Sequence, residues 1–180
     1  MKNIIRLTRP YQWAKNIFIL LPMFFGGALT DSQSAIYAFM AFFAYSFAAS
    51  AIYCYNDIID VEDDRRHSEK CKRPIASGAI SIKQGYVIMT LMMILSAAFI
   101  VLMKDRALLV GGVVVTYFIL DILYCRWLKR HAIVDVCVLS FGFVLRILAG
   151  GFATDIVPSN WLVMMTFLLT LFLSFAKRRG

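Results

Sequence analysis

The chain has 180 residues, of which 61% are hydrophobic and 17% are charged, and its formal net charge is +8. This composition is too apolar for an ordinary water-soluble domain and indicates a membrane-embedded protein. It excludes a signal peptide followed by a soluble domain. The positive charge does not predict a nucleic-acid partner, because basic residues in a membrane protein first report which side of the bilayer they occupy.

Six long apolar runs predict six transmembrane helices. A helix needs about 20 mostly apolar residues to cross a bilayer, and these runs show none of the period-two alternation of a membrane β-barrel. In chain order, we place the helices at about 11–29, 35–55, 84–103, 107–125, 132–151 and 161–176. The predicted fold class is therefore all-α, a polytopic transmembrane helix bundle with one membrane domain over residues 1–180.

Basic residues are distributed unequally between the two ends of these spans. If the N-terminus is cytoplasmic, 16 of the 19 lysines and arginines lie inside, only Lys104 and Arg106 lie outside, and Arg146 remains within the membrane. The positive-inside rule therefore predicts a multi-pass protein with a cytoplasmic N-terminus.

The segment 56–83 is the one long connection, and it carries six of the eleven acidic residues. Asp57, Asp60 and Asp64 share one face if a helix continues out of the second span, and Asn56 lies beside that face. Three converging carboxylates repel one another unless a divalent ion lies between them. Mg2+ prefers such oxygen ligands and often shares them with a substrate phosphate. We predict that these four residues bind Mg2+ and that the three aspartates are catalytic.

Basic side chains follow the acidic motif within nine positions. Beside a metal site they favour a diphosphate ligand, because the metal and the guanidinium groups bind different oxygens of one leaving group. Arg65, Lys70 and Arg73 are the predicted ligands of this kind. A solvated loop with local salt bridges is the alternative, but it explains only the charges and not the spacing of the aspartates.

The acidic segment matches N-D-x-x-D-x-x-x-D at Asn56, Asp57, Asp60 and Asp64. In this motif the sequence resembles the UbiA superfamily of membrane-embedded prenyltransferases. Further likeness, greatest to the phosphoribosyltransferase branch, lies at 9–16, 64–78, 124–135 and 176–179. The resemblance implies a bundle of about nine transmembrane helices around a central cavity, of which this chain would hold six.

The resemblance also implies a Mg2+-dependent transferase of the bacterial inner membrane that works at the surface of the lipid bilayer. In the phosphoribosyltransferase branch, phosphoribosyl diphosphate is the donor, a polyprenyl phosphate such as decaprenyl phosphate is the acceptor, and pyrophosphate is released. Such a product would be a cell-wall precursor. The alternative is the more typical reaction, in which a prenyl diphosphate donates its prenyl group to an aromatic acceptor. A homo-oligomer is left open.

Two features depart from the family pattern. Ser68 stands where the pattern has proline, and the chain stops after six spans, before the second acidic region of the family. We therefore expect either a fragment of a longer protein or a short product that needs a partner to complete the cavity. A non-catalytic membrane subunit and a small transporter are the remaining alternatives.

Lys15, Tyr124, Lys129, Asp135 and Arg146 complete the predicted substrate-binding set, together with Asn56. Ionisable groups inside a membrane are costly and usually face the bundle interior or a wet cavity. Asp135 and Arg146 are about 16 Å apart along one helix, so we expect each to find a partner on another helix.

Asp121, one turn before Tyr124, is assigned a local structural role. The pairs Gly111-Gly112 and Gly150-Gly151 are embedded in apolar helix without G-x-G-x-x-G spacing, which predicts close helix packing and not a nucleotide loop.

Overall fold

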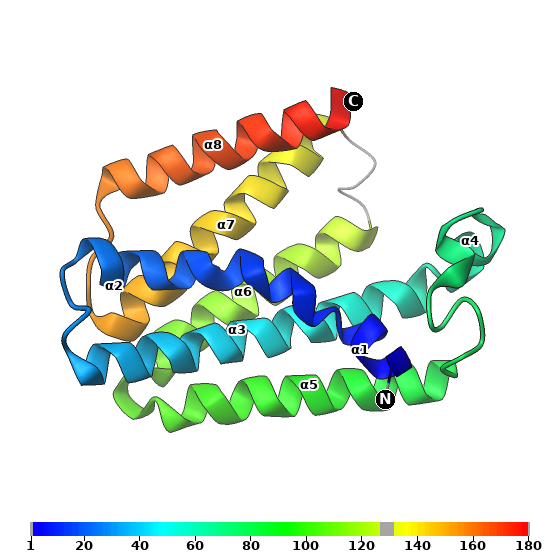
Figure 1. Cartoon of the computed structure of the whole chain (residues 1–180), viewed down its shortest axis with the longest axis horizontal. Coiled ribbons are helices and arrows are strands. Elements are labelled where there is room, and N and C mark those ends of the chain that lie inside the picture. Colours follow the sequence, from blue (N-terminus) through cyan, green and yellow to red (C-terminus); the bar gives the residue numbers. More distant parts are fainter. Residues whose placement is uncertain (1, 127–131, 180) are drawn as a thin grey trace.

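The computed structural model describes residues 2–126 and 132–179, and only the backbone at Ala132, Arg178 and Arg179. Regular structure in these ranges is entirely helical (Figure 1), as the composition predicts. Within the described ranges, five helices are long and apolar enough to cross a membrane. They are α3 (Ser32–Ile59), α5 (Ile82–Leu102), α6 (Ala107–Arg126), α7 (Ala132–Thr154) and α8 (Asn160–Arg179). Their ends agree with the predicted second to sixth spans to within a few residues.

The predicted first span, 11–29, is not a single α-helix. It consists of a 3-10 helix, η1 (Pro10–Leu20), followed directly by α2 (Leu21–Phe25). A 3-10 helix rises about 2.0 Å per residue and an α-helix about 1.5 Å, so the two elements together extend about 30 Å. This length is close to the thickness of the hydrocarbon core of a bilayer, so the segment is long enough to cross it with fewer residues than an α-helix would need.

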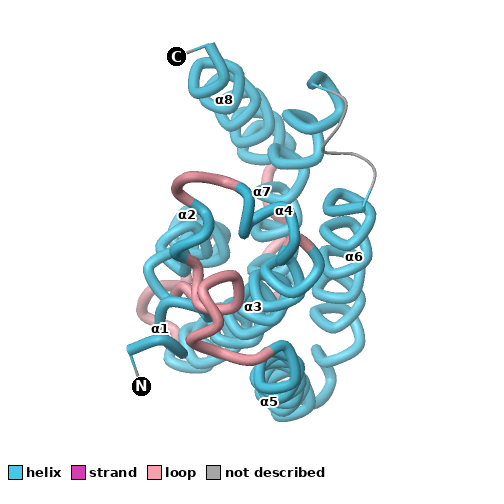
Figure 2. The backbone as a smooth tube through the Cα atoms, turned by 90° about the vertical axis from the view of Figure 1, so that its right-hand side faces the viewer, coloured by secondary structure: helices cyan, strands magenta, loops and turns pink. Residues whose placement is uncertain are grey.

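Helix α3 lies at the centre of the bundle (Figure 2) and packs against η1, α5, α6 and α7. Small residues such as Ala41, Ala44 and Ala48 line its buried surface. They allow neighbouring backbones to approach closely, which is how helices in membranes usually associate. On the α5 side, the Ser96 hydroxyl donates a hydrogen bond to the Ala44 carbonyl at 2.7 Å.

The outer helices expose apolar side chains. On α5, Val87, Ile94 and Val101 are exposed, whereas the polar Ser96 is buried. Helix α8 likewise exposes Met165, among other apolar residues. In a soluble protein such apolar side chains would face the core and polar ones the solvent. Here the apolar side chains can contact lipid tails, as expected for a helix bundle surrounded by lipid.

The N-terminus, α4 (Val61–Arg66) and the C-terminal end of α8 lie at the same end of the bundle (Figure 1). A cluster of buried hydrophobic side chains at this end joins α1 (Lys2–Thr8), the end of α3 and the segment 56–83. Its members are Leu7, Cys54, Ile58, Val61, Ile75 and Ile80. Burial of these side chains holds this segment, including η2 (Lys70–Lys72), against the bundle. At the opposite end, η3 (Lys104–Arg106) connects α5 to α6.

Candidate functional site

The acidic motif lies where α3 ends and α4 begins. The predicted continuous helix is interrupted, because α3 ends at Ile59 and the backbone of Asp60 leaves helical geometry. Two backbone hydrogen bonds nevertheless cross the interruption, from the Asp60 amide to the Asn56 carbonyl at 2.9 Å and from the Asp64 amide to the Asp60 carbonyl at 2.8 Å. The motif thus keeps nearly helical spacing.

Two of the aspartates converge on arginine side chains. Arg73 Nη1 donates to Asp57 Oδ1 at 3.3 Å and to Asp64 Oδ2 at 2.7 Å. Arg9 Nη2 donates to the same Asp57 oxygen at 2.7 Å. Asp57 and Asp64 are buried, with 1% and 2% of their surfaces exposed, whereas Asp60 is half-buried. The structure therefore brings Asp57, Asp64 and Arg73 together, three residues that the sequence assigns to the site.

Arg9 is a member of this cluster that the predicted site omits. Its backbone is in the left-handed region, with φ of 49°, at the turn between α1 and η1. This turn directs the guanidinium group toward the end of α3, where it also lies over the Tyr53 ring at 5.2 Å. The sequence signal was limited to Pro10, which is favoured at the start of a helix and makes Arg9 a helix boundary; it does not predict the contact with Asp57.

The donor atoms fit a magnesium ion shared with a substrate. Asp57 Oδ2 is buried and has no hydrogen-bond partner. In the part of the chain that the structure describes, no three Asp, Glu, His or Cys side chains are close enough to bind a metal by themselves. A site closed by the three aspartates alone is therefore not preformed. The arrangement suits Mg2+ held by one or two carboxylates, with its other ligands from a diphosphate and water.

A polar cavity of about 200 Å³ lies beside this cluster, between η1, α3, α6 and α7. Four predicted substrate-binding residues line it, namely Lys15, Asn56, Tyr124 and Arg146. The other lining residues are Ile52, Tyr53, Tyr117, Leu120, Asp121, Val138, Leu139, Gly142 and Phe143. Asn56 connects the cavity with the acidic motif, since Asp57 is its neighbour in sequence.

Arg146 is buried and finds its partner on another helix, as its isolation on α7 predicts. Its Nε donates to Asn16 Oδ1 on η1 at 2.8 Å, and its Nη1 donates to the Gly142 carbonyl at 2.8 Å. The guanidinium group also lies over the rings of Tyr45 and Tyr117, at 4.9 and 5.2 Å. Hydrogen bonds and ring faces together offset the cost of burying this charge.

We expect the substitution Asn16→Leu to lower the free energy of unfolding by about 2–3 kcal/mol, because it leaves Arg146 Nε without an acceptor. It also removes the hydrogen bond that Asn16 Nδ2 donates to Ser46 Oγ, with 2.8 Å between the two atoms. Thermal unfolding in detergent measures this loss. Thr116→Val is the matched control, since the exposed Thr116 hydroxyl donates only to Gly112 of its own helix. Equal stability of the two variants would contradict the assignment.

Tyr124 lines the cavity and also contacts a predicted residue that does not, and the remaining predicted residues that the structure describes lie outside the cavity. Tyr124 hydrogen-bonds to the buried Asp135, which ties the end of α6 to the start of α7. Arg65 Nε donates to the Ala76 carbonyl at 3.3 Å, and Lys70 is exposed on η2. Lys129 lies outside the described residues, so its predicted role stays a prediction.

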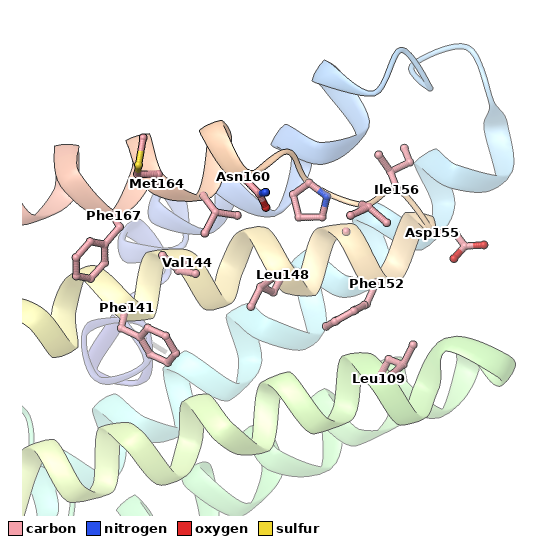
Figure 3. Close-up of a pocket in the computed structure, with 14 residues that line it drawn as sticks. Leu109, Phe141, Val144, Leu148, Phe152, Asp155, Ile156, Asn160, Met164 and Phe167 are labelled. Carbon is pink, nitrogen blue, oxygen red and sulfur yellow. The ribbon is translucent and has the colours of Figure 1, made fainter.

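A larger groove of about 810 Å³ lies elsewhere, between α7, α8 and the start of α6 (Figure 3). Leu109, Phe141, Phe152 and Phe167 are among the side chains that line it. Its lining is mostly apolar and carries no lysine or arginine. The larger volume therefore does not coincide with the site predicted from the sequence, because the basic side chains expected to bind a diphosphate line the smaller cavity.

The helices and their polar cavity define an all-α integral membrane protein with a cluster of carboxylates and guanidinium groups at one end of the bundle. Comparison with known proteins agrees with this class. The UbiA prenyltransferase family model matches residues 18–178, and the chain belongs to this family.

The relatives include transferases by name. The decaprenyl-phosphate phosphoribosyltransferase of Mycobacterium tuberculosis is 35% identical over 180 residues, which cover 98% of this chain and 59% of the relative. The enzyme of the same name from Corynebacterium glutamicum is 35% identical over 178 residues, which cover 98% and 53% of the two chains. The chain thus spans less than two thirds of the length of these relatives.

Solved structures share the fold. A UbiA homologue from Archaeoglobus fulgidus, bound to DMAPP and Mg2+, superposes with a TM-score of 0.78 at 18% identity, over 98% of this chain and 62% of that one. A structure of digeranylgeranylglyceryl phosphate synthase gives a TM-score of 0.71 at 19% identity, over 98% and 60% of the chains. These likenesses show a common helical architecture.

Proposed function

We propose that the protein transfers the 5-phosphoribosyl group of phosphoribosyl diphosphate to a polyprenyl phosphate, such as decaprenyl phosphate, in a Mg2+-dependent reaction that releases pyrophosphate. The observation that carries this proposal is the meeting of Asp57 and Asp64 at Arg73, beside a cavity that contains Lys15 and Arg146. Acidic ligands for a metal and cations for phosphate groups are thus combined at one membrane surface. The phosphoribosyltransferases at 35% identity support the choice of donor.

The acidic motif would hold the metal and the diphosphate. Asn56, Asp57, Asp60 and Asp64 would supply the oxygen ligands for Mg2+, and a bound Mg2+ would stabilise negative charge on the diphosphate leaving group. Arg73 contacts two of these carboxylates and can bind a phosphate oxygen at the same time, because a guanidinium group has five N–H donors.

Other basic residues would bind the outer phosphate groups. Lys15 lies at the cavity, and Arg65, Lys70 and Lys129 are proposed to hold the diphosphate and the 5-phosphate from the membrane surface. The hydrogen bond between Tyr124 and Asp135 keeps α6 and α7 together beside the cavity. Arg146, fixed by Asn16, presents a charge that cannot be deprotonated to the anionic substrate.

The chemical step needs no strong general base. An oxygen of the lipid phosphate attacks C1 of the ribose, the bond between C1 and the diphosphate oxygen breaks, and pyrophosphate leaves with the electron pair. Because the attacking phosphate is already an anion near neutral pH, no proton has to be removed from it. The protein contributes by orienting the two phosphates and by stabilising charge on the leaving group.

The same proposal includes the orientation in the membrane. The acidic motif and the N-terminus lie at one end of the bundle (Figure 1), and the positive-inside rule assigns this end to the cytoplasm. Phosphoribosyl diphosphate would then reach the site from the cytoplasm, while the polyprenyl tail stays in the bilayer of the bacterial inner membrane.

A donor assay tests the proposal. Membranes that carry the chain, alone and joined to the C-terminal helices of the M. tuberculosis relative, receive decaprenyl phosphate, Mg2+ and labelled phosphoribosyl diphosphate. We expect label in the lipid fraction, and we expect chelation of Mg2+ to abolish it. Parallel reactions contain a prenyl diphosphate and an aromatic acceptor. Product from the prenyl donor alone, or no product from either donor, would overturn the proposed function.

A further inference from the structure

Asp121 has no part in the reaction described above, yet it faces the same cavity. It lies on α6, lines the cavity with Arg146 and Lys15, and receives a side-chain hydrogen bond from Tyr117. Its Oδ2 atom is buried and has no hydrogen-bond partner. A carboxylate oxygen withdrawn from water without a donor is costly. The local structural role predicted from the sequence therefore explains the contact with Tyr117 but not the burial of Oδ2.

The nearby cation does not explain it either. Arg146 donates hydrogen bonds from Nε to Asn16 Oδ1 and from Nη1 to the Gly142 carbonyl, and its guanidinium group lies over the Tyr45 ring. Among the residues that the structure describes, Asp121 and Arg146 form no ion pair within 4.0 Å. The two groups attract each other at longer range, so no side chain of the described residues supplies a hydrogen-bond donor to Oδ2.

We propose that Asp121 accepts a hydrogen bond from a ribose hydroxyl of the donor and thereby selects a sugar diphosphate over an isoprenyl diphosphate. This inference rests on the proposed function and names the residue that would decide between its two donors. A hydroxyl group supplies the donor that Oδ2 lacks. An isoprenyl chain supplies none, and it would place hydrocarbon against a buried carboxylate.

The charged residues of the cavity are consistent with two roles, attraction of the phosphate groups by the basic residues and binding of a hydroxyl group by Asp121. Lys15 and Arg146 give two positive charges against the one carboxylate of Asp121, so the cavity still attracts an anionic substrate. A site built to hydrogen-bond a hydroxyl discriminates against an analogue that lacks it by about 10⁴–10⁵. A carboxylate in this position therefore contributes to separating the two donor classes.

The test compares donors in wild-type protein and in Asp121→Asn. The donors are phosphoribosyl diphosphate and its analogues without the 2-hydroxyl or the 3-hydroxyl group. We expect Asp121→Asn to lower kcat/KM for phosphoribosyl diphosphate roughly ten- to a hundredfold, as for the loss of a charged hydrogen bond. One of the two analogues lacks the hydroxyl group that Asp121 binds. For this analogue, wild type and variant should have the same kcat/KM, whereas a merely structural role of Asp121 would lower kcat/KM for every donor.

Asp155→Asn is the matched control, because Asp155 is an exposed carboxylate at the opposite end of the bundle, 3.6 Å from Arg106. It should behave as wild type with every donor. An Asp121→Asn variant that keeps full kcat/KM for phosphoribosyl diphosphate would overturn the inference and leave the proposed function standing. The wild-type protein alone gives a second test if the variant does not fold. Equal use of both deoxy analogues and the ribosyl donor would also reject the role of Asp121. Failure of wild type to use phosphoribosyl diphosphate would instead reject the proposed function.

Discussion

Replacing Asp57 by asparagine is expected to reduce phosphoribosyl transfer by at least about a hundredfold and to raise the Mg2+ concentration needed for half-maximal rate. Asp57 is buried, holds both Arg9 and Arg73 through one oxygen, and has its other oxygen unpartnered. The amide keeps the size of the side chain but removes the negative charge that makes a carboxylate a stronger ligand for Mg2+ than an amide oxygen. Initial rates in membranes over a range of Mg2+ concentrations measure both effects.

Asp63→Asn is the control for this substitution. Asp63 lies on the short helix α4, next to Asp64, but it is exposed and is not one of the four motif residues. It should keep wild-type turnover and Mg2+ dependence. If the triple replacement of Asp57, Asp60 and Asp64 by asparagine also kept them, the acidic motif would have no role in the reaction.

Replacing Gly150 by alanine is expected to cost about 3 kcal/mol or more of stability. Helix α7 crosses η1 so closely at this point that an added methyl group would overlap the backbone carbonyl of Ile19. A backbone group cannot turn away as a flexible side chain does, so the two helices must separate. Because η1 also carries Lys15 and Asn16, their separation would displace both residues from the cavity and from Arg146.

Gly112→Ala is the matched control on a neighbouring helix. No atom lies within 4 Å of a Cβ built at Gly112, so alanine should fit there and stabilise α6 by about 0.5–1 kcal/mol through its higher helix propensity. Thermal unfolding in detergent, with the yield of folded protein, compares the two variants. Similar stability for both would show that α7 and η1 do not need this contact.

The membrane spans were the most predictable part of the fold. The second to sixth apolar runs each form one α-helix, because a backbone in hydrocarbon must satisfy its own hydrogen bonds. The first span was the exception. Hydropathy reports that 11–29 is apolar but not that it winds as a 3-10 helix over most of its length, a choice that depends on its packing against α3 and α7.

The site was predicted in part. The spacing of Asp57 and Asp64 placed them on one face, and the structure brings both to Arg73. It does not do the same for Arg65, which binds a backbone carbonyl instead. Spacing along a helix predicts which side chains are neighbours on that helix, but it contains no information about contacts made by a loop that folds back.

The sequence by itself determined that this protein is a helical membrane bundle with an acidic motif after its second span, because hydrophobic length and helical spacing are local properties. Only the tertiary structure decided that Arg9, 48 positions away in the chain, contacts Asp57, and that Asp121 faces a polar cavity with an unpartnered oxygen. Both facts depend on how separate helices pack, and packing is set by the shapes of surfaces that lie far apart in the sequence.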